Sequence, residues 1–213
     1  MGKSSSLSLG GCTRCPRLFE ERQKIKKQFP DYRCEPVGQW GDFKARILVI
    51  GLAPGLHGAA RTGRAFVGDS SGAFLFSALF RNGLSNSPEP GSARLLGVGI
   101  TNAVKCYPPA NKPTGSEVRN CESFLRRELE SYIRIRNRDK RSLIVLGRIA
   151  QQATYAALGV RAPSFEHGSS HLVSPKLSVF TSYHPSRLNV NTKRLTAEML
   201  DTVLLAAKSF VGS

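Results

Sequence analysis

The sequence predicts a three-layer α/β domain that is built around a parallel β-sheet. Four compact apolar runs have the length of strands, and helix-like stretches alternate with them along the chain. Two of these runs are hydrophobic at every position, as expected of strands that helices cover on both faces. Such alternation favours parallel strands joined by right-handed crossovers. Because no repeat or long linker interrupts it, we expect residues 1–213 to form one domain, with residues 1–11 as a flexible tail.

The predicted elements follow one another in a regular order. A stretch with alternating charges and few apolar residues predicts a short exposed helix over Leu18 to Gln28. The predicted strands are Ile47 to Ile50, Leu95 to Ile100, Leu143 to Leu146 and Leu177 to Thr181. The further predicted helices cover about Ser71 to Phe80, Ser116 to Ile133, Ala150 to Leu158 and Thr192 to Phe210. Segments rich in Gly, Pro, Ser and Asn predict surface loops over Arg81 to Arg94 and Tyr107 to Gly115.

The composition excludes some classes of protein and favours others. With 213 residues, of which 40% are hydrophobic, the chain can bury a core, which argues against wholesale disorder and a fibrous protein. The 31 Lys and Arg against 15 Asp and Glu give a formal net charge of +16. This surplus favours a polyanionic partner such as DNA, although RNA or a membrane surface would satisfy the same charge. No signal peptide or membrane span is apparent, so we expect a soluble cytoplasmic protein, associated with the nucleoid in a prokaryote.

Four of the five cysteines have a spacing that suits a metal centre. Cys12 and Cys15 are two residues apart, so one turn can present both thiolates to a metal. Cys106 and Cys121, with fourteen residues between them, fall in a loop after a strand and on the next helix. Four thiolates fit a four-iron cluster or a structural zinc, and the spacing does not decide between them. The alternative is that Cys106 and Cys121 are buried free thiols, and Cys34 is the odd one out.

Polar residues gather where the predicted strands end. In open parallel sheets, ligands bind beyond the carboxyl ends of the strands. Here these ends lead into Gly51 to Asp69, Thr101 to Cys106, Gly147-Arg148 and Ser182 to Asn189. We therefore expect the chemistry of this protein to lie in these four segments.

The segment after the first strand has the composition of a nucleotide site. Gly51-Leu-Ala-Pro-Gly55-Leu-His-Gly58 fits neither a phosphate-binding loop nor a dinucleotide loop. Its glycines instead indicate a backbone that passes close to a ligand. The next residues supply guanidinium groups for phosphate, the Phe66 ring for base stacking, and the Asp69 carboxylate. Asp69 also fits the cap of the following helix, and the two roles are compatible.

Two further polar residues follow later strands. Asn102 carries an amide, which supplies both a donor and an acceptor and so can read a base edge. His184 follows the last predicted strand, at the same edge of the sheet. A lone His is more often structural than functional, but the convergence of four such segments favours a functional role.

Taken together, these motifs resemble those of the uracil-DNA glycosylase superfamily, most closely its iron-sulfur, B-type branch (family 5). The resemblance rests on the joint order of Cys12-x2-Cys15, Gly51-Leu-Ala-Pro-Gly55, Arg61-Thr-Gly-Arg64-x-Phe-x-Gly-Asp69, Thr101-Asn-Ala-Val-Lys-Cys106, Cys121 and His184-Pro-Ser-x-Leu-Asn189, and it runs from about Cys12 to Phe210. It implies a uracil-DNA glycosylase-like α/β/α fold around a four-stranded parallel sheet. It also implies a structural [4Fe-4S] cluster on Cys12, Cys15, Cys106 and Cys121.

The resemblance also implies roles for individual residues. Asp69 would be catalytic, because the position that carries a polar residue in other branches lies in the apolar Gly51 to Gly55 here, as is typical of the B-type branch. Asn102 would read the base, and His184 would polarise a base carbonyl. Ala60 stands where related sequences often have Asn, so no role is assigned to it. The expected substrate contacts are Gly51, Ala53, Pro54, Gly55, His57, Arg64, Phe66, Ser186, Arg187 and Asn189.

The function that follows from the resemblance is that of a monofunctional DNA glycosylase in base excision repair. It would hydrolyse the N-glycosidic bond of uracil, and of other deaminated bases such as hypoxanthine if the apolar first motif makes a roomier pocket. The protein would act as a monomer on DNA, with Pro185 to Asn191 wedging the base stack and the basic strip Arg134 to Arg141 following phosphates. The alternatives are a catalytically inactive iron-sulfur protein that binds nucleic acid, and a hydrolase that uses Cys106 and His184.

Overall fold

The sheet of this protein is mixed and has six strands in the part of the chain that the structure describes. The computed structural model describes residues 9–134 and 139–212. The strand order is β1-β3-β2-β4-β6-β5. The strands are β1 (Trp40–Gly41), β2 (Ile47–Gly51), β3 (Val98–Asn102), β4 (Arg141–Leu146), β5 (Ser170–Ser174) and β6 (Leu177–Ser182). The four inner strands run parallel, while β1 and β5 pair antiparallel at the two edges.

The prediction of a four-stranded parallel sheet therefore missed the two antiparallel edge strands. The two edge strands carry no apolar run that could reveal them. β1 is only two residues long, and β5 is exposed at four of its five positions. Neither strand is covered on both faces, so neither needs a continuous hydrophobic sequence.

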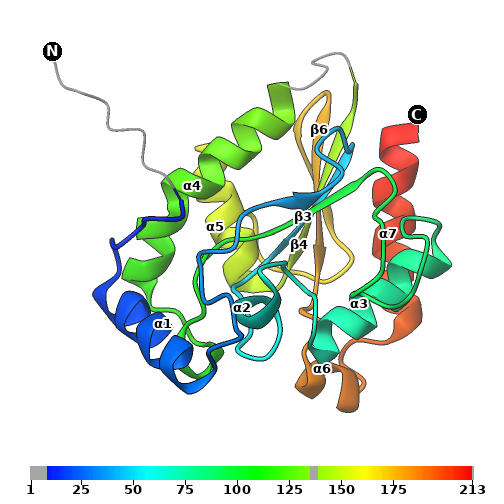
Figure 1. Cartoon of the computed structure of the whole chain (residues 1–213). Coiled ribbons are helices and arrows are strands. Elements are labelled where there is room, and N and C mark those ends of the chain that lie inside the picture. The colour runs from blue at the N-terminus through cyan, green and yellow to red at the C-terminus, as the bar shows by residue number, and fades with distance from the viewer. Residues whose placement is uncertain (1–8, 135–138, 213) are drawn as a thin grey trace, which may run out of the picture.

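Helices cover the sheet on both faces, which gives three layers (Figure 1). α3 (Ser70–Arg81) and α7 (Ala197–Gly212) lie on one face, and α4 (Gly115–Arg134) and α5 (Arg148–Leu158) lie on the other. Side chains of β2 alternate between two cores: Ile47 and Val49 pack toward α3 and α7, while Leu48 and Ile50 pack toward α4 and α5. This alternation explains why every residue of β2 is buried.

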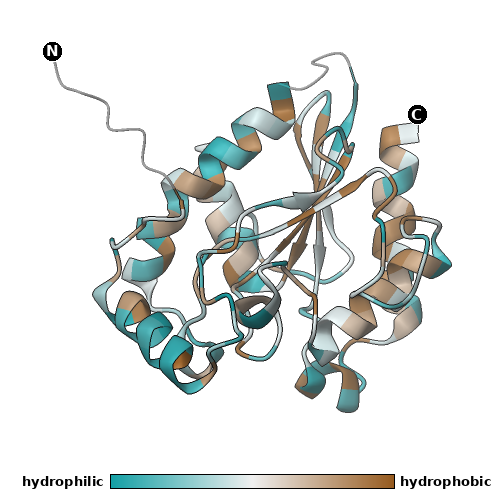
Figure 2. Cartoon of the chain, viewed as in Figure 1, coloured by the Kyte–Doolittle hydropathy of each residue, from teal (hydrophilic) through white to brown (hydrophobic). Residues whose placement is uncertain are grey.

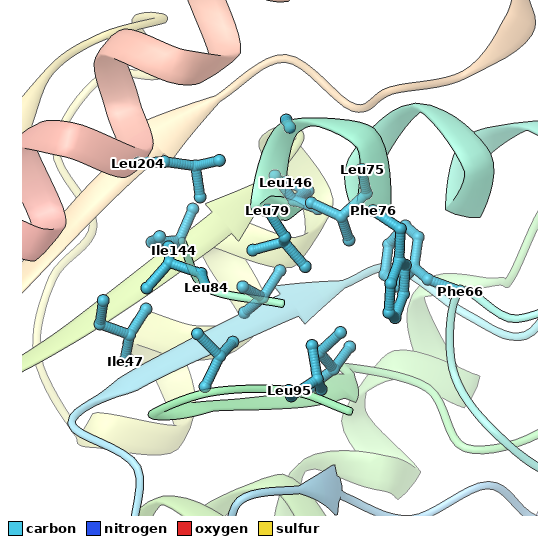
Figure 3. Packing of buried hydrophobic residues seen from close by; sticks show 14 of the residues in the cluster. Ile47, Phe66, Leu75, Phe76, Leu79, Leu84, Leu95, Ile144, Leu146 and Leu204 are labelled. Atoms are coloured by element: carbon cyan, nitrogen blue, oxygen red, sulfur yellow. The ribbon is translucent and has the colours of Figure 1, made fainter. Parts of the chain in front are cut away.

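The core on the α3 and α7 side reaches from the middle of the sheet to its carboxyl edge. Leu75 and Leu79 of α3 and Leu204 of α7 converge on the strand residues in Figure 3. Phe66 belongs to the same cluster, so its side chain packs against this core. In Figure 2 the inner strands and the helix sides that face them are largely apolar, whereas α1 is mostly polar.

The N-terminal helix matches its prediction closely. α1 (Pro16–Gln28) begins at a proline, which needs no hydrogen-bond partner in a first turn, and it buries Leu18, Arg22 and Ile25 along one side. The predicted helix over Thr192 to Phe210 is wrong at its start. The chain forms the short α6 (Arg187–Asn191), turns at Lys193 with a φ of 57°, and begins α7 only at Ala197.

Two other predictions need correction. The strand predicted from Leu95 begins at Val98, because Leu95 forms an isolated bridge with Ser85 and Gly97 has a positive φ of 69°. The segments predicted as surface loops are partly buried. Leu84 and Ala93 pack into the core, and Tyr107 is only 8% exposed. Most of the predicted tail over residues 1–11 lies outside the described residues. No described helix has the length and apolar character to cross a membrane.

Candidate active site

A cavity of about 1190 Å³ opens at the carboxyl ends of the inner strands. Its walls come from the segments after β2, β3 and β6, the short helix α2 (Ala59–Thr62), the start of α3, and the loop around Pro90. Ten of the residues predicted from the sequence line it: Ala53, Gly55, His57, Arg64, Phe66, Asp69, Asn102, His184, Ser186 and Arg187. The structure thus gathers the three candidate catalytic side chains in one cavity.

Three of the predicted contact residues do not line the cavity. Gly51 lies behind it at the end of β2, and Pro54 is buried. Asn189 instead donates a hydrogen bond from its side-chain amide to the carbonyl of His184 at 2.8 Å. The Ser186 hydroxyl oxygen caps α6 by accepting a hydrogen bond from the backbone N–H of Asn189. These last two residues hold the His184 segment in shape.

Asp69 is held at the cavity wall by the helix that it caps. Its Oδ1 accepts a hydrogen bond from the backbone N–H of Gly72 at 2.9 Å, in the first turn of α3. Its Oδ2 lies against the backbone of Gly55 and Gly58: a Cβ at Gly55 would come within 2.8 Å of this oxygen, and one at Gly58 would overlap it. The glycines of the loop therefore make room for the carboxylate. The capping role and the place in the cavity occur together.

Asn102 ends β3 with an unpaired acceptor. The residue is 2% exposed, and its side-chain Oδ1 has no hydrogen-bond partner. A buried polar atom without a partner is costly, so an amide held this way is set up for a ligand. Gly51 on the neighbouring strand makes the space, because a Cβ there would overlap both Asn102 Oδ1 and the Phe66 ring.

Phe66 has a backbone conformation that side chains rarely adopt. Its φ is 61°, in the left-handed region, and it is 6% exposed. Its carbonyl packs so tightly against the first turn of α3 that a Cβ at Gly72 would overlap it. The ring lies 5.9 Å from the His184 ring at an angle of 31°. Strain of this kind needs support from the surrounding structure, and it places an aromatic face at the cavity.

His184 is neutral in this environment. Burial lowers the pKa of its imidazole to about 4, and the negative charge of Asp69 only partly opposes that shift. The imidazole therefore carries no charge near pH 7, where it can donate one hydrogen bond and accept another.

The shift of the His184 pKa predicts how stability depends on pH. The unfolded imidazole titrates near 6.5, and the folded one near 4. In this window the unfolded chain binds more protons, so the free energy of unfolding falls as the pH drops from 6.5 to 4. The melting temperature of His184→Gln should depend less on pH between 6.5 and 4 than that of the wild type. Some dependence on pH should persist in the variant, because burial also lowers the pKa of His167. An identical pH slope in both proteins would contradict the assignment.

Some residues at or beside the cavity gave no signal in the sequence. Tyr32, from the segment after α1, does not line the cavity, but its hydroxyl shares a hydrogen bond of 2.8 Å with Nδ1 of His57, which does. Glu89, Pro90 and Gly91 come from a loop that was expected only to lie on the surface. Nothing in the local sequence distinguishes these residues, because their position results from long-range packing.

The four predicted metal ligands come together at a second, small cavity. Cys12, Cys15, Cys106 and Cys121 all line it, between the start of α1 and the first half of α4. Burial raises the pKa of the Cys106 thiol to about 12, and it also raises those of Cys15 and Cys121. Cys34 packs elsewhere, with Ile25, Ala60 and Tyr107.

The side chains in this small cavity do not by themselves form a site for one ion. Within residues 9–134 and 139–212, no group of three or more His, Cys, Asp or Glu side chains has the arrangement that would hold a metal ion. The structure does not support a Cys106 and His184 pair either, since these two side chains line different cavities.

Comparisons with known proteins agree with the family that the sequence motifs resemble. A family model described as the uracil DNA glycosylase superfamily matches residues 39–208. The chain is 45% identical to the type-5 uracil-DNA glycosylase of Pyrobaculum aerophilum, over 96% of this chain and 91% of that protein. It is 44% identical to the type-5 enzyme of Thermus thermophilus, over 96% of each. A type-4 uracil-DNA glycosylase of Pyrobaculum aerophilum is 29% identical over 73% of this chain and 74% of that protein.

Proposed function

Since this chain belongs to the uracil-DNA glycosylase superfamily, we propose that its cavity takes up a uracil turned out of DNA and that Asp69, Asn102 and His184 act on it. The chain is a uracil-DNA glycosylase of base excision repair. A base in a duplex is out of reach of any side chain, so it must leave the stack before its bond is cut. The observation that carries the assignment of residues is the shared cavity of these three side chains.

The reaction is a hydrolysis. The bond between the sugar C1′ and the base nitrogen breaks, and the oxygen of a water molecule bonds to C1′. One proton of this water passes to Asp69 and on to solvent. The bonding electrons stay with the base, which leaves as an anion and takes up a proton from solvent, so the products are free uracil and an abasic site. Asp69 orients the water and stabilises the positive charge that develops on the sugar. Its fixed position as a helix cap keeps the carboxylate aimed at one place.

The departing base carries the negative charge. Asn102 offers its amide to the base edge, and its unpaired buried Oδ1 can accept the N–H of a uracil ring. A neutral His184 donates a hydrogen bond to a base oxygen, where negative charge grows as the bond breaks. Phe66 stacks on the ring. Uracil leaves as a stabilised anion, so a single carboxylate suffices where most glycosidases need two.

The apolar first motif supports a wider range of bases. Leu52 and Ala53 line the cavity, so no polar side chain of this motif occupies the space beside the base. We therefore extend the proposed substrates to hypoxanthine. A panel of duplexes, each with one uracil, hypoxanthine or xanthine, followed by alkaline cleavage at abasic sites, tests both statements. Scission at uracil is expected, with slower scission at hypoxanthine. Intact DNA across the panel would refute the proposed activity, and cleavage at uracil alone would refute only the wider range.

The DNA surface is proposed to lie around the cavity mouth. Arg187 lines the cavity, and Leu188 beside it is 72% exposed at the start of α6, where it can enter the gap left by the base. The described members of the strip Arg134 to Arg141 do not support this role. Arg134 ends α4 and Arg141 begins β4, at the end of the strands opposite to the cavity, and Arg141 is 2% exposed with its guanidinium bonded to the carbonyl of Ala45. Residues 135–138 lie outside the described residues.

We also propose that the four thiols of the second cavity hold a [4Fe-4S] cluster. Four soft sulfur donors around one small buried space are the donor set that such clusters take. Burial raises the pKa values of these thiols and so disfavours their thiolate forms. The positive charge of bound iron would stabilise the thiolates. When bound, the cluster would link the N-terminal segment, the loop after β3 and α4 through its cysteine ligands. The cavity that would hold it shares no lining residue with the catalytic cavity.

Metal analysis tests this proposal. Protein purified without oxygen is expected to contain about four iron and four sulfide per chain and to absorb visible light. Cys121→Ser should lose most of the iron and unfold at a lower temperature, whereas Cys34→Ser, at a buried cysteine outside the cavity, should keep the iron. Zinc in place of iron, or equal iron in both variants, would contradict the cluster.

A further inference from the structure

An ion pair between a buried lysine and a partly buried glutamate lies next to the backbone of Asn102. The ammonium of Lys105 is 1% exposed and lies 2.6 Å from Oε2 of Glu128 on α4. Its other two hydrogen bonds go to Thr101 Oγ1 at 2.8 Å and to the backbone carbonyl of Asn102 at 2.6 Å. All three donors of this buried lysine are therefore used, and one of them holds the peptide group of the residue that is proposed to read the base.

Lys105 donates a hydrogen bond that a neighbouring strand would otherwise supply. β1 pairs with β3 only at Ile100 and Gly99, so Thr101 and Asn102 extend beyond it. On the other side, Asn102 pairs with Gly51 of β2. The Asn102 carbonyl would have no strand to bond at this open edge, and Lys105 bends back from the following loop to supply the donor.

Glu128 connects this support to two other parts of the chain. Its Oε2 also accepts a hydrogen bond from the Thr101 hydroxyl at 2.7 Å, and its Oε1 accepts one from the backbone N–H of Gln39 at 3.0 Å. The network thus joins the end of β3 to α4 and to the segment before β1. A buried ion pair contributes little net stability compared with apolar side chains of the same size, so stability alone does not account for it.

We infer that Lys105 and Glu128 are positioning residues that fix the base-reading amide of Asn102 at the cavity. This inference rests on the proposed function. The Asn102 side chain has no hydrogen bond of its own through Oδ1, so its place depends on its backbone and on the space left by Gly51. A shift of about 1 Å in such a group can lower a rate about a hundredfold. Loss of either partner should therefore slow the chemical step without removing any group that contacts the base.

A double-mutant cycle tests this inference. Single-turnover excision of uracil is measured at saturating enzyme for the wild type, Lys105→Met, Asn102→Ala and the double variant. Lys105→Met is expected to reduce the rate constant about 10- to 100-fold, with little change in DNA affinity. In the Asn102→Ala background, the same substitution should have no further effect, because the amide that Lys105 positions is absent. A role confined to stability would lower the active fraction and the melting temperature, and would leave the rate constant at saturation unchanged.

The controls separate the possible failures. Arg126→Met removes a partly exposed ion pair with Glu122 on the same helix, and a hydrogen bond to the Ala156 carbonyl, away from the cavity, and should keep the wild-type rate. If Lys105→Met does not fold, Glu128→Gln takes its place in the cycle, since glutamine keeps the volume and one acceptor. Equal losses in both backgrounds, or a wild-type rate for the single variant, would overturn the inference. A wild type that leaves uracil in DNA would instead refute the proposed function.

Discussion

Asp69→Asn is expected to lose most of the uracil excision while the fold stays as stable as in the wild type. Asp69 does two things, which this substitution separates. As the cap of α3, it accepts a hydrogen bond from Gly72, and asparagine caps a helix equally well. As a carboxylate, it orients water and stabilises positive charge, which a neutral amide cannot do. The expected decrease in the single-turnover rate is about 10²- to 10⁴-fold.

Two companion variants sharpen this test. Asp69→Ala removes both functions, so it should also lower the free energy of unfolding by about 1 kcal/mol through the lost cap. Asp42→Asn changes another aspartate that bonds a nearby backbone N–H, that of Lys44, outside the cavity, and should keep the full rate. Wild-type activity in Asp69→Asn would remove the carboxylate from the mechanism.

Gly51→Ala should have the second largest effect, although Gly51 does not line the cavity. A methyl group there would overlap the Asn102 amide and the Phe66 ring, two of the groups proposed to hold the base. Gly51 has the backbone conformation of a regular strand, which alanine can also adopt. The expected damage therefore comes from the lack of space for the methyl group. We expect the excision rate to fall about a hundredfold and the free energy of unfolding to fall by about 1–3 kcal/mol.

Gly212→Ala is the matched control for this substitution. Gly212 lies in α7, where an added Cβ would meet no atom within 4 Å. The melting temperature and excision rate of the Gly212→Ala variant should equal those of the wild type. If Gly51→Ala behaved in the same way as Gly212→Ala, the close packing of Asn102 and Phe66 against the strand would have no functional importance.

Local sequence was sufficient where a residue has a strong local signature. The continuous apolar runs at Ile47 to Ile50 and Leu143 to Leu146 correctly indicated strands covered on both faces. Asp69 was correctly expected to cap a helix, since the residues after it form α3. Of the four segments expected at one edge of the sheet, those after β2, β3 and β6 line one cavity, whereas Gly147-Arg148 after β4 does not. These features depend on neighbours in the chain and on the parallel order of the strands.

Other features could not be predicted in this way. The edge strands β1 and β5 carry no hydrophobic pattern, and the break between α6 and α7 depends on a left-handed turn at Lys193. The buried charge of Lys105 appears in the sequence only as one cation among many.

The sequence by itself therefore determined the inner strands, the long helices that cover them and the residue types at the edge of the sheet, because patterns of burial and capping are encoded within a few residues. The short helices α2 and α6 and the start of α7 were not determined in this way. Only the tertiary structure decided which glycine faces which side chain and which buried cation supports which carbonyl. Three such contacts are those of Gly51 with Asn102, Gly58 with Asp69, and Lys105 with Glu128. The residues of each pair lie on different segments of the chain. Their contacts exist only once the sheet and its helices have packed.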